Sequence, residues 1–173
     1  TSAPMPATAC TAQPSGMVGW WRGEGDAIDA AGNNPGSLRN GATFSNGYVG
    51  QGFSLDGLDD YVDIGDVAQL QNAGAITVMA WIKPNNTVPS IAGIVGKWST
   101  SSGTNNTFLL NLGPNSAAQN GAFFVQFSDG SNAWVTGQTA IPTNQWTHIT
   151  GTWRNSDGAL TIYKNGVADG TIN

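Results

Sequence analysis

From Met17 onward, short apolar runs alternate with turn signals about every ten residues, which restricts the chain to folds built from many short strands. The turn signals are Asn-Gly and Asp-Gly pairs, and Asn165-Gly166 is the sharpest because this pair suits both positive-φ positions of a type I′ hairpin. The spacing predicts an antiparallel β-sandwich or barrel. Residues 66–74 are the one segment that reads as a helical turn.

Alternation within two of these runs predicts which side chains share a face, because successive side chains of a strand point to opposite faces. In 75–83, one face carries Ile76, Val78, Ala80 and Ile82, and the other carries Thr77, Met79, Trp81 and Lys83. In 145–154, one face carries Trp146, His148, Thr150 and Thr152, and the other carries Thr147, Ile149, Gly151 and Trp153. Aromatic residues therefore lie on both faces of the predicted sheets.

Composition excludes several classes of protein. Charged residues make up 10% of the chain, whereas 55 residues are Ser, Thr, Asn or Gln and 24 are Gly, so the charged and aliphatic surfaces of a helical bundle are missing. The net charge of −5 provides no basic surface to neutralise phosphates, so we expect no nucleic-acid partner. No run of 18 apolar residues occurs, so we expect no membrane-spanning segment.

Residues 1–16 carry prolines at positions 4, 6 and 14 and are predicted to be an extended arm or linker, leaving 17–173 as one domain. A start at Thr1 fits a processed secretory product or an excised domain. Cys10 is the only cysteine, so it is either a free thiol or the site of an intermolecular bridge.

The acid and histidine counts argue against an enzyme. Glu24 is the only glutamate, which removes mechanisms that need a pair of glutamates. His148 is the only histidine, which excludes a multi-histidine zinc site, and no nucleophile-elbow sequence lies near it. We expect His148 to be a hydrogen-bonded framework residue.

Six short motifs follow one another along the chain in a characteristic order. The chain carries MVGWWRGEGD at 17–26, VGQGFSLDG at 49–57, DDYV at 59–62, ITVMAWIKP at 76–84, QWTHITGT at 145–152 and LTIYKNG at 160–166. This series, collinear over 17–167, resembles the laminin-G-like branch of the concanavalin A-like lectin/glucanase superfamily. The resemblance implies an all-β jelly-roll sandwich of two antiparallel sheets and places Trp20, Trp81 and Trp146 in framework strands, where we expect them in the core.

The resemblance also bears on function. Members of this superfamily bind glycans or proteins, hold calcium, or act as spacers. The glucanase branch carries Glu-x-Asp-x-x-Glu, which this chain cannot form with Glu24 alone. The family pattern continues beyond the Asn-Gly hairpin, so we expect either that closing strands are missing here or that another chain supplies them by strand addition.

Acidic residues gather in two clusters, and the first of them is a candidate metal site. The first lies in a glycine-rich loop, where Glu24, Asp26, Asp29, Asn33 and Asn34 offer the hard oxygens that calcium prefers. The resemblance makes Asp29 the best calcium ligand. The second cluster is read as turn and edge-strand chemistry rather than as a metal site, and consists of Asp56, Asp59, Asp60, Asp63 and Asp66.

Seven tryptophans suggest carbohydrate binding, because indole faces stack on sugar rings while amides and carboxylates read hydroxyl groups. Two of them lie beside polar loops, and the predicted carbohydrate site consists of Trp98, Asn105, Asn106, Asp129, Asn132 and Trp134.

The sequence therefore predicts a non-catalytic, secreted or cell-surface recognition or adhesion module, with a glycan or a cell-surface protein as partner and calcium as a candidate cofactor. The alternative is a structural subunit of a surface filament or layer, a homo-oligomer or polymer assembled through the arm and the open strand position.

Overall fold

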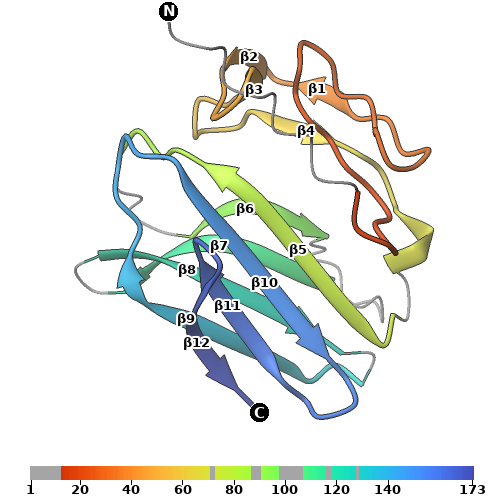
Figure 1. Ribbon diagram of the computed structural model, residues 1–173, viewed down its shortest axis with the longest axis vertical. Coiled ribbons are helices and arrows are strands. Elements are labelled where there is room, and N and C mark those ends of the chain that lie inside the picture. The colour runs from red at the N-terminus through yellow and green to blue at the C-terminus, as the bar shows by residue number, and fades with distance from the viewer. Residues whose placement is uncertain (1–12, 71–72, 87–90, 98–106, 116–117, 128) are drawn as a thin grey trace, which may run out of the picture. The chain divides into compact units, whose positions relative to one another are not determined.

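The computed structural model describes residues 13–70, 73–86, 91–97, 107–115, 118–127 and 129–173 (Figure 1). The chain divides into two units, Thr1–Gly65 and Asp66–Asn173. The fold is all-β and its sheets are antiparallel, as predicted. The single domain predicted over 17–173, with an arm at 1–16, stays a prediction.

The first unit contains two small antiparallel sheets. Strands β1 (Ser37–Arg39) and β4 (Tyr61–Asp63) form one, and β2 (Thr43–Asn46) and β3 (Gln51–Ser54) form the other. Phe44 lies opposite Phe53 in the β2–β3 hairpin, with 5.6 Å between the ring centroids. In the apolar run 17–22, Trp21 makes an isolated bridge to Asp29, and no strand forms among the described residues there.

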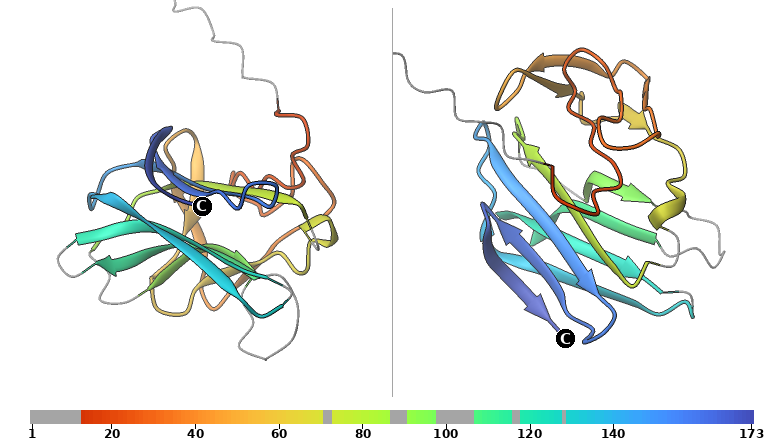
Figure 2. Two further views of the ribbon diagram at one scale, coloured as in Figure 1. Left: turned by 90° about the horizontal axis from the view of Figure 1, so that it is seen from below. Right: turned by 45° about the vertical axis from the view of Figure 1, so that its right-hand side comes forward.

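The second unit contains two four-stranded sheets that lie as two layers (Figure 2). One sheet has the order β12-β11-β10-β5 and the other has the order β6-β7-β8-β9. The strands of this unit, listed in chain order, are β5 (Ala75–Ile82), β6 (Ala92–Lys97), β7 (Thr107–Asn115), β8 (Ala118–Gln126), β9 (Asn132–Ala140), β10 (Thr147–Arg154), β11 (Leu160–Lys164) and β12 (Val167–Ile172). The predicted helical turn is confirmed as the short 3-10 helix η1 (Ala68–Leu70).

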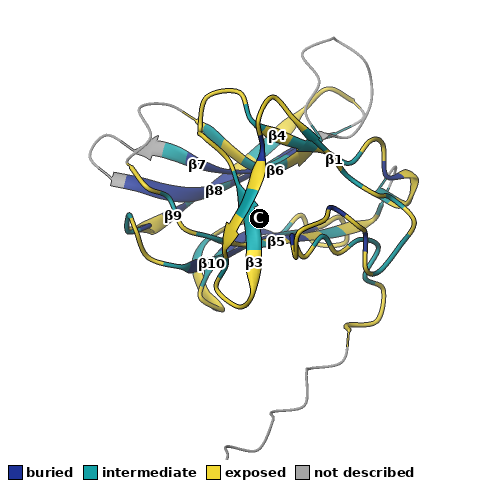
Figure 3. Ribbon diagram, turned by 90° about the horizontal axis from the view of Figure 1, so that it is seen from above, coloured by how far each residue is buried: buried dark blue, intermediate teal, exposed yellow. Residues whose placement is uncertain are grey.

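The hydrophobic core of this unit lies between its two sheets. The described residues of β7 and β8 carry much of it (Figure 3), including Leu110 and Phe123, which are fully buried. The alternation predicted for 145–154 is confirmed: Thr147, Ile149, Gly151 and Trp153 of β10 are buried, whereas the residues between them are half-buried. The core is therefore built by alternate residues of each strand, which leaves the other set of side chains on the outer faces.

The edges of the two sheets are connected by polar contacts. Asp169 of β12 accepts hydrogen bonds from the backbone nitrogen of Thr139 in β9 at 3.2 Å and from its Oγ1 at 2.7 Å. Lys164 donates to the carbonyl oxygen of Ala140 at 2.6 Å. The predicted assembly through residues 1–16 and an open strand position stays a prediction, because residues 1–12 lie outside the described residues.

The hairpin predicted at Asn165-Gly166 is confirmed, with φ values of 49° and 80° at its two central residues. The Oδ1 atom of Asn165 also accepts a hydrogen bond from the backbone nitrogen of His148 at 2.9 Å. We expect Asn165→Ala to lower the free energy of unfolding by about 1–2 kcal/mol, because alanine is strained at positive φ and loses this acceptor. Urea denaturation measures the effect. Asn165→Gly tolerates the φ value, so an equal loss in both variants would contradict the strain argument.

Candidate functional site

Trp134 is the most exposed aromatic residue among the described positions and lies mid-strand in β9. Its side chain is 67% exposed, whereas the next residue, Val135, is 3% exposed and belongs to the core. Trp134 is paired with Phe124 of β8, which is paired in turn with Leu109 of β7. Directly opposed residues share a face, so the three side chains form an apolar row across the outer face of the β6–β9 sheet.

Polar side chains lie next to this row on the same face. Asn132 is exposed and opposes Gln126, two residues from Trp134 along β9. Asp129 lies in the preceding turn, where its Oδ1 accepts hydrogen bonds from the Oγ of Ser131 at 2.5 Å and the backbone nitrogen of Ser131 at 2.9 Å. These two hydrogen bonds lower the pKa of Asp129, so its carboxylate is ionised and holds the turn.

The predicted carbohydrate site is therefore described in part. The structure brings Asn132 and Trp134 onto one face and puts Asp129 in the adjoining turn. Trp98, Asn105 and Asn106 lie outside the described residues. The described positions on this outer face are uncharged, namely Gly93, Gly96, Leu109, Asn111, Ala122, Phe124, Gln126, Asn132, Trp134 and Thr136.

Two of the three tryptophans expected in the core are instead exposed. Trp81, on the outer face of the β12-β11-β10-β5 sheet, is 46% exposed, and Trp20 of the first unit is 45% exposed, so the core placement of both residues is wrong. Trp146 is half-buried, and Trp153 is the tryptophan that packs into the core. The alternation of 75–83 puts Trp81 opposite the core side chains of β5, so the signal for its exposure is present in the sequence.

His148 lies beside Trp81 on this face. The two rings are 5.2 Å apart between centroids and tilted by 56°. The Nδ1 atom of His148 lies 3.4 Å from the Oγ1 atom of Thr150. Desolvation by burial lowers the pKa of His148, so the ring is neutral at pH 7 and acts as a packed framework residue, as expected.

Asp29 is buried in the glycine-rich loop of the first unit, with 6% of its surface exposed. Its Oδ1 accepts hydrogen bonds from the backbone nitrogens of Trp20, Ala31 and Gly32 at 2.8 to 3.0 Å, and its Oδ2 accepts two from Asn34. Desolvation opposes ionisation, but the backbone hydrogen bonds outweigh it and lower the pKa of Asp29 to about 2. The carboxylate therefore holds the loop together.

The other residues of the predicted calcium site have separate local roles. Glu24 accepts a hydrogen bond from the backbone nitrogen of Gln51 at 3.1 Å, and Asp26 accepts one from Ile28 at 3.1 Å. Asn33 is exposed. Among the described residues, the three carboxylates Glu24, Asp26 and Asp29 do not form a cluster of metal-ligand spacing. The donors around Asp29 do not suit a cation, and calcium at Glu24, Asp26, Asp29 and Asn33 stays a prediction.

The described acidic residues that do gather are Asp56, Asp59 and Asp60, whose nearest oxygens lie within 4.8 Å of one another. Asp56 Oδ1 accepts hydrogen bonds from the backbone nitrogens of Leu58 at 2.8 Å and Asp59 at 3.3 Å. These hydrogen bonds, with Leu58 the largest contribution, lower the pKa of Asp56. This cluster therefore performs the turn chemistry expected of it.

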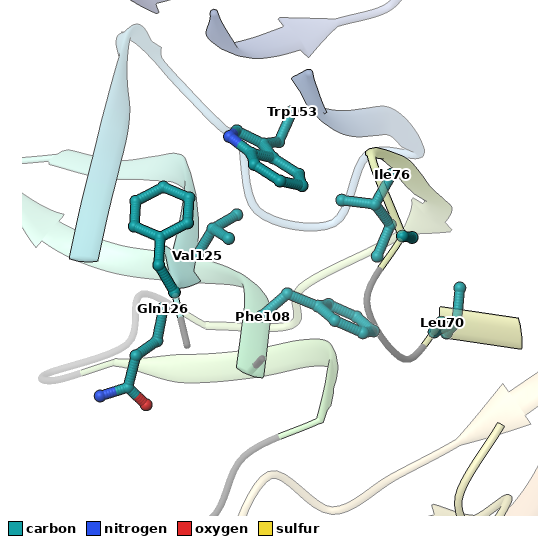
Figure 4. A pocket seen from close by; sticks show the side chains of 8 residues that line it. Leu70, Ile76, Phe108, Val125, Gln126 and Trp153 are labelled. Atoms are coloured by element: carbon teal, nitrogen blue, oxygen red, sulfur yellow. The ribbon is translucent and has the colours of Figure 1, made fainter. Parts of the chain in front are cut away.

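A small apolar cavity of about 20 Å³ opens at one end of the second unit's core (Figure 4). Its labelled lining residues include Leu70, Phe108 and Trp153. A cavity of this volume holds about one water molecule, and its lining offers few polar partners. The cavity is therefore a packing defect of the core rather than a ligand site.

Comparison with known proteins gives one match. A family model described as concanavalin A-like lectin/glucanases superfamily matches residues 56–173. No curated protein and no solved structure matches the chain. In the described part of the chain, no helix has the length and apolar character required to cross a membrane.

Proposed function

Because the chain belongs to the concanavalin A-like lectin/glucanase superfamily, we propose that it is a non-catalytic, secreted or cell-surface binding module whose ligand is a carbohydrate. The observation that carries the proposal is the exposure of Trp134 on the outer face of the β6–β9 sheet. A tryptophan with 67% of its side chain in water contributes little to the core, and its apolar face is available for a sugar ring.

The surroundings of Trp134 support a polyhydroxylated ligand. Asn132 and Gln126 supply amide donors and acceptors beside the indole, and Thr136 adds a hydroxyl group on the same face. A few placed polar groups around an aromatic surface are the usual means of orienting a small ligand. The non-catalytic part of the proposal rests on Glu24 being the only glutamate.

We expect Trp134→Ala to weaken binding of the best ligand from a glycan array by at least tenfold, which corresponds to about 1.4 kcal/mol. Isothermal titration calorimetry measures the loss. Trp134→Phe keeps an aromatic ring and should retain part of the affinity. Trp20→Ala is the matched control, because it removes an indole that is 45% exposed in the first unit. Equal affinity of wild type and Trp134→Ala would exclude this face as the binding site.

A further inference from the structure

The outer face of the β12-β11-β10-β5 sheet has a regular arrangement of side chains that the proposed site does not use. Strand pairing puts Thr77, Thr152, Thr161 and Thr171 in one cross-strand row. The next row contains Met79, Thr150 and Tyr163, and the last contains Trp81 and His148. We call these nine residues the threonine–tryptophan face.

Two large apolar side chains of this face are exposed, although the side chains on the other side of the same strand pack in the core. Met79 is 50% exposed and Trp81 is 46% exposed, whereas Val78 is 9% exposed and packs in the core. Met79 and Trp81 point away from this core, so packing in the core does not explain why large apolar side chains occupy these two positions.

Contacts within the threonine–tryptophan face fix the directions of its side chains. The Trp81 and His148 rings contact each other, and Thr150 Oγ1 lies 3.4 Å from His148 Nδ1. Thr161 Oγ1 lies 3.2 Å from Thr171 Oγ1. Thr161 is buried, whereas Thr77 and Thr171 are exposed and Thr150 and Thr152 are half-buried. β-branched side chains have few rotamers, and neighbouring strands lie about 4.8 Å apart, so the accessible hydroxyl groups have fixed positions on the face.

No member of the threonine–tryptophan face carries a carboxylate, an ammonium or a guanidinium group. Of the neighbouring cations, Arg154 pairs with Asp157 and Lys164 donates to Ala140, whereas Lys83 lies exposed just beyond the end of β5, two residues after Trp81. A sulfated or uronic acid sugar lying on the nine residues themselves would lose hydration without gaining an opposite charge from them. An aromatic platform next to a row of hydroxyl groups matches the apolar face and hydroxyl rim of a neutral sugar.

We propose that the threonine–tryptophan face is a second carbohydrate site, which takes a neutral oligosaccharide with one ring against Trp81 and its hydroxyl groups toward Thr150 and the threonine row. This inference rests on the proposed function. The inner faces of the two sheets pack on each other, so the outer faces that carry Trp81 and Trp134 point in opposite directions. One module then binds two sugar chains and cross-links them.

The test is the stoichiometry of binding to the intact chain, measured by calorimetry with neutral hexasaccharides of glucose, xylose, mannose and N-acetylglucosamine. We expect two molecules of the best hexasaccharide per wild-type chain, one for Trp81→Ala, one for Trp134→Ala and none for the double variant. Trp20→Ala should keep two. Thr150→Val, which retains shape but removes a hydroxyl group, should weaken one of the two sites by about threefold to tenfold.

The outcomes separate this inference from the proposed function. One site in wild type that is lost in Trp134→Ala and kept in Trp81→Ala overturns the second site and leaves the proposed function intact. No binding of any hexasaccharide overturns both. Tight binding of a heparin hexasaccharide that depends on Trp81 overturns the neutral class. A wild-type dimer seen by light scattering, which is abolished in Trp81→Ala and does not respond to sugar, identifies the face as a contact between copies and also overturns the proposal.

Trp81→Phe is the folding control for this experiment, because it keeps an aromatic ring at the position. Two sites are expected for Trp81→Phe, and they would show that the loss in Trp81→Ala is not a folding defect.

Discussion

Replacing Gly151 with alanine is expected to lower the free energy of unfolding of residues 66–173 by about 2–3 kcal/mol. A Cβ atom at this position of β10 would lie 2.3 Å from Cγ and 2.5 Å from Cδ2 of the Phe123 ring. Phe123 belongs to β8 in the opposite sheet and is fully buried. The ring therefore packs directly on the glycine backbone, and added volume forces the two sheets apart or the ring from its rotamer.

A double-mutant cycle tests whether the ring is the cause. Phe123→Leu alone leaves a cavity and should also be destabilising. Combined with Gly151→Ala, it removes the clashing ring, so the alanine should cost less in the Phe123→Leu background than in wild type. Gly74→Ala is the control, because a Cβ atom at Gly74 would meet no atom within 4 Å and the φ value there is ordinary. Additive losses in guanidinium denaturation would contradict the packing argument.

The strands of the second unit could be predicted well from the sequence because their pattern is local. Alternation in β10 and β5 sorts the side chains into two faces without knowledge of the partner strand, and burial agrees with that division. The rows of the threonine–tryptophan face could not be predicted in the same way. They depend on the register in which Thr77 meets Thr152, and that register is set by pairing between strands far apart in the sequence.

The candidate sites show the same division between local and long-range information. The sequence puts Trp134 beside a polar loop that contains Asn132, and the two residues share a face because β9 begins at Asn132. The placement of Trp81 in the core follows the resemblance to framework strands and ignores its alternation with Val78, which is why it is wrong. The donors around Asp29 could not be predicted, because backbone nitrogens belong to every residue and their directions depend on loop conformation, including positive φ at Gly23 and Gly25.

Asp29→Asn is expected to destabilise the loop of residues 20–34 by about 3 kcal/mol, although the substitution preserves shape. Both carboxylate oxygens of Asp29 face donors, three on Oδ1 and two on Oδ2. Whichever way an asparagine amide is turned, its NH₂ group meets N–H groups that then lack an acceptor. Hydrogen exchange of the Trp20, Ala31 and Gly32 amides measures the loss locally, and it does not require the first unit to fold by itself.

The pH dependence of the same amides provides an independent check. The pKa of Asp29 is lowered from 3.8 to about 2, so its contribution to stability is complete above pH 4 and is lost as the pH falls from 3.8 through 2. The lowered pKa corresponds to at most about 2.5 kcal/mol. In wild type, hydrogen exchange in this loop should therefore accelerate below pH 4 by more than the intrinsic exchange rate changes. No such extra acceleration is expected in Asp29→Asn.

Asp26→Asn is the matched control, because Asp26 accepts one exposed hydrogen bond from Ile28. If Asp26→Asn loosened the loop as much as Asp29→Asn, general loss of negative charge would explain the effect better than the buried acceptor.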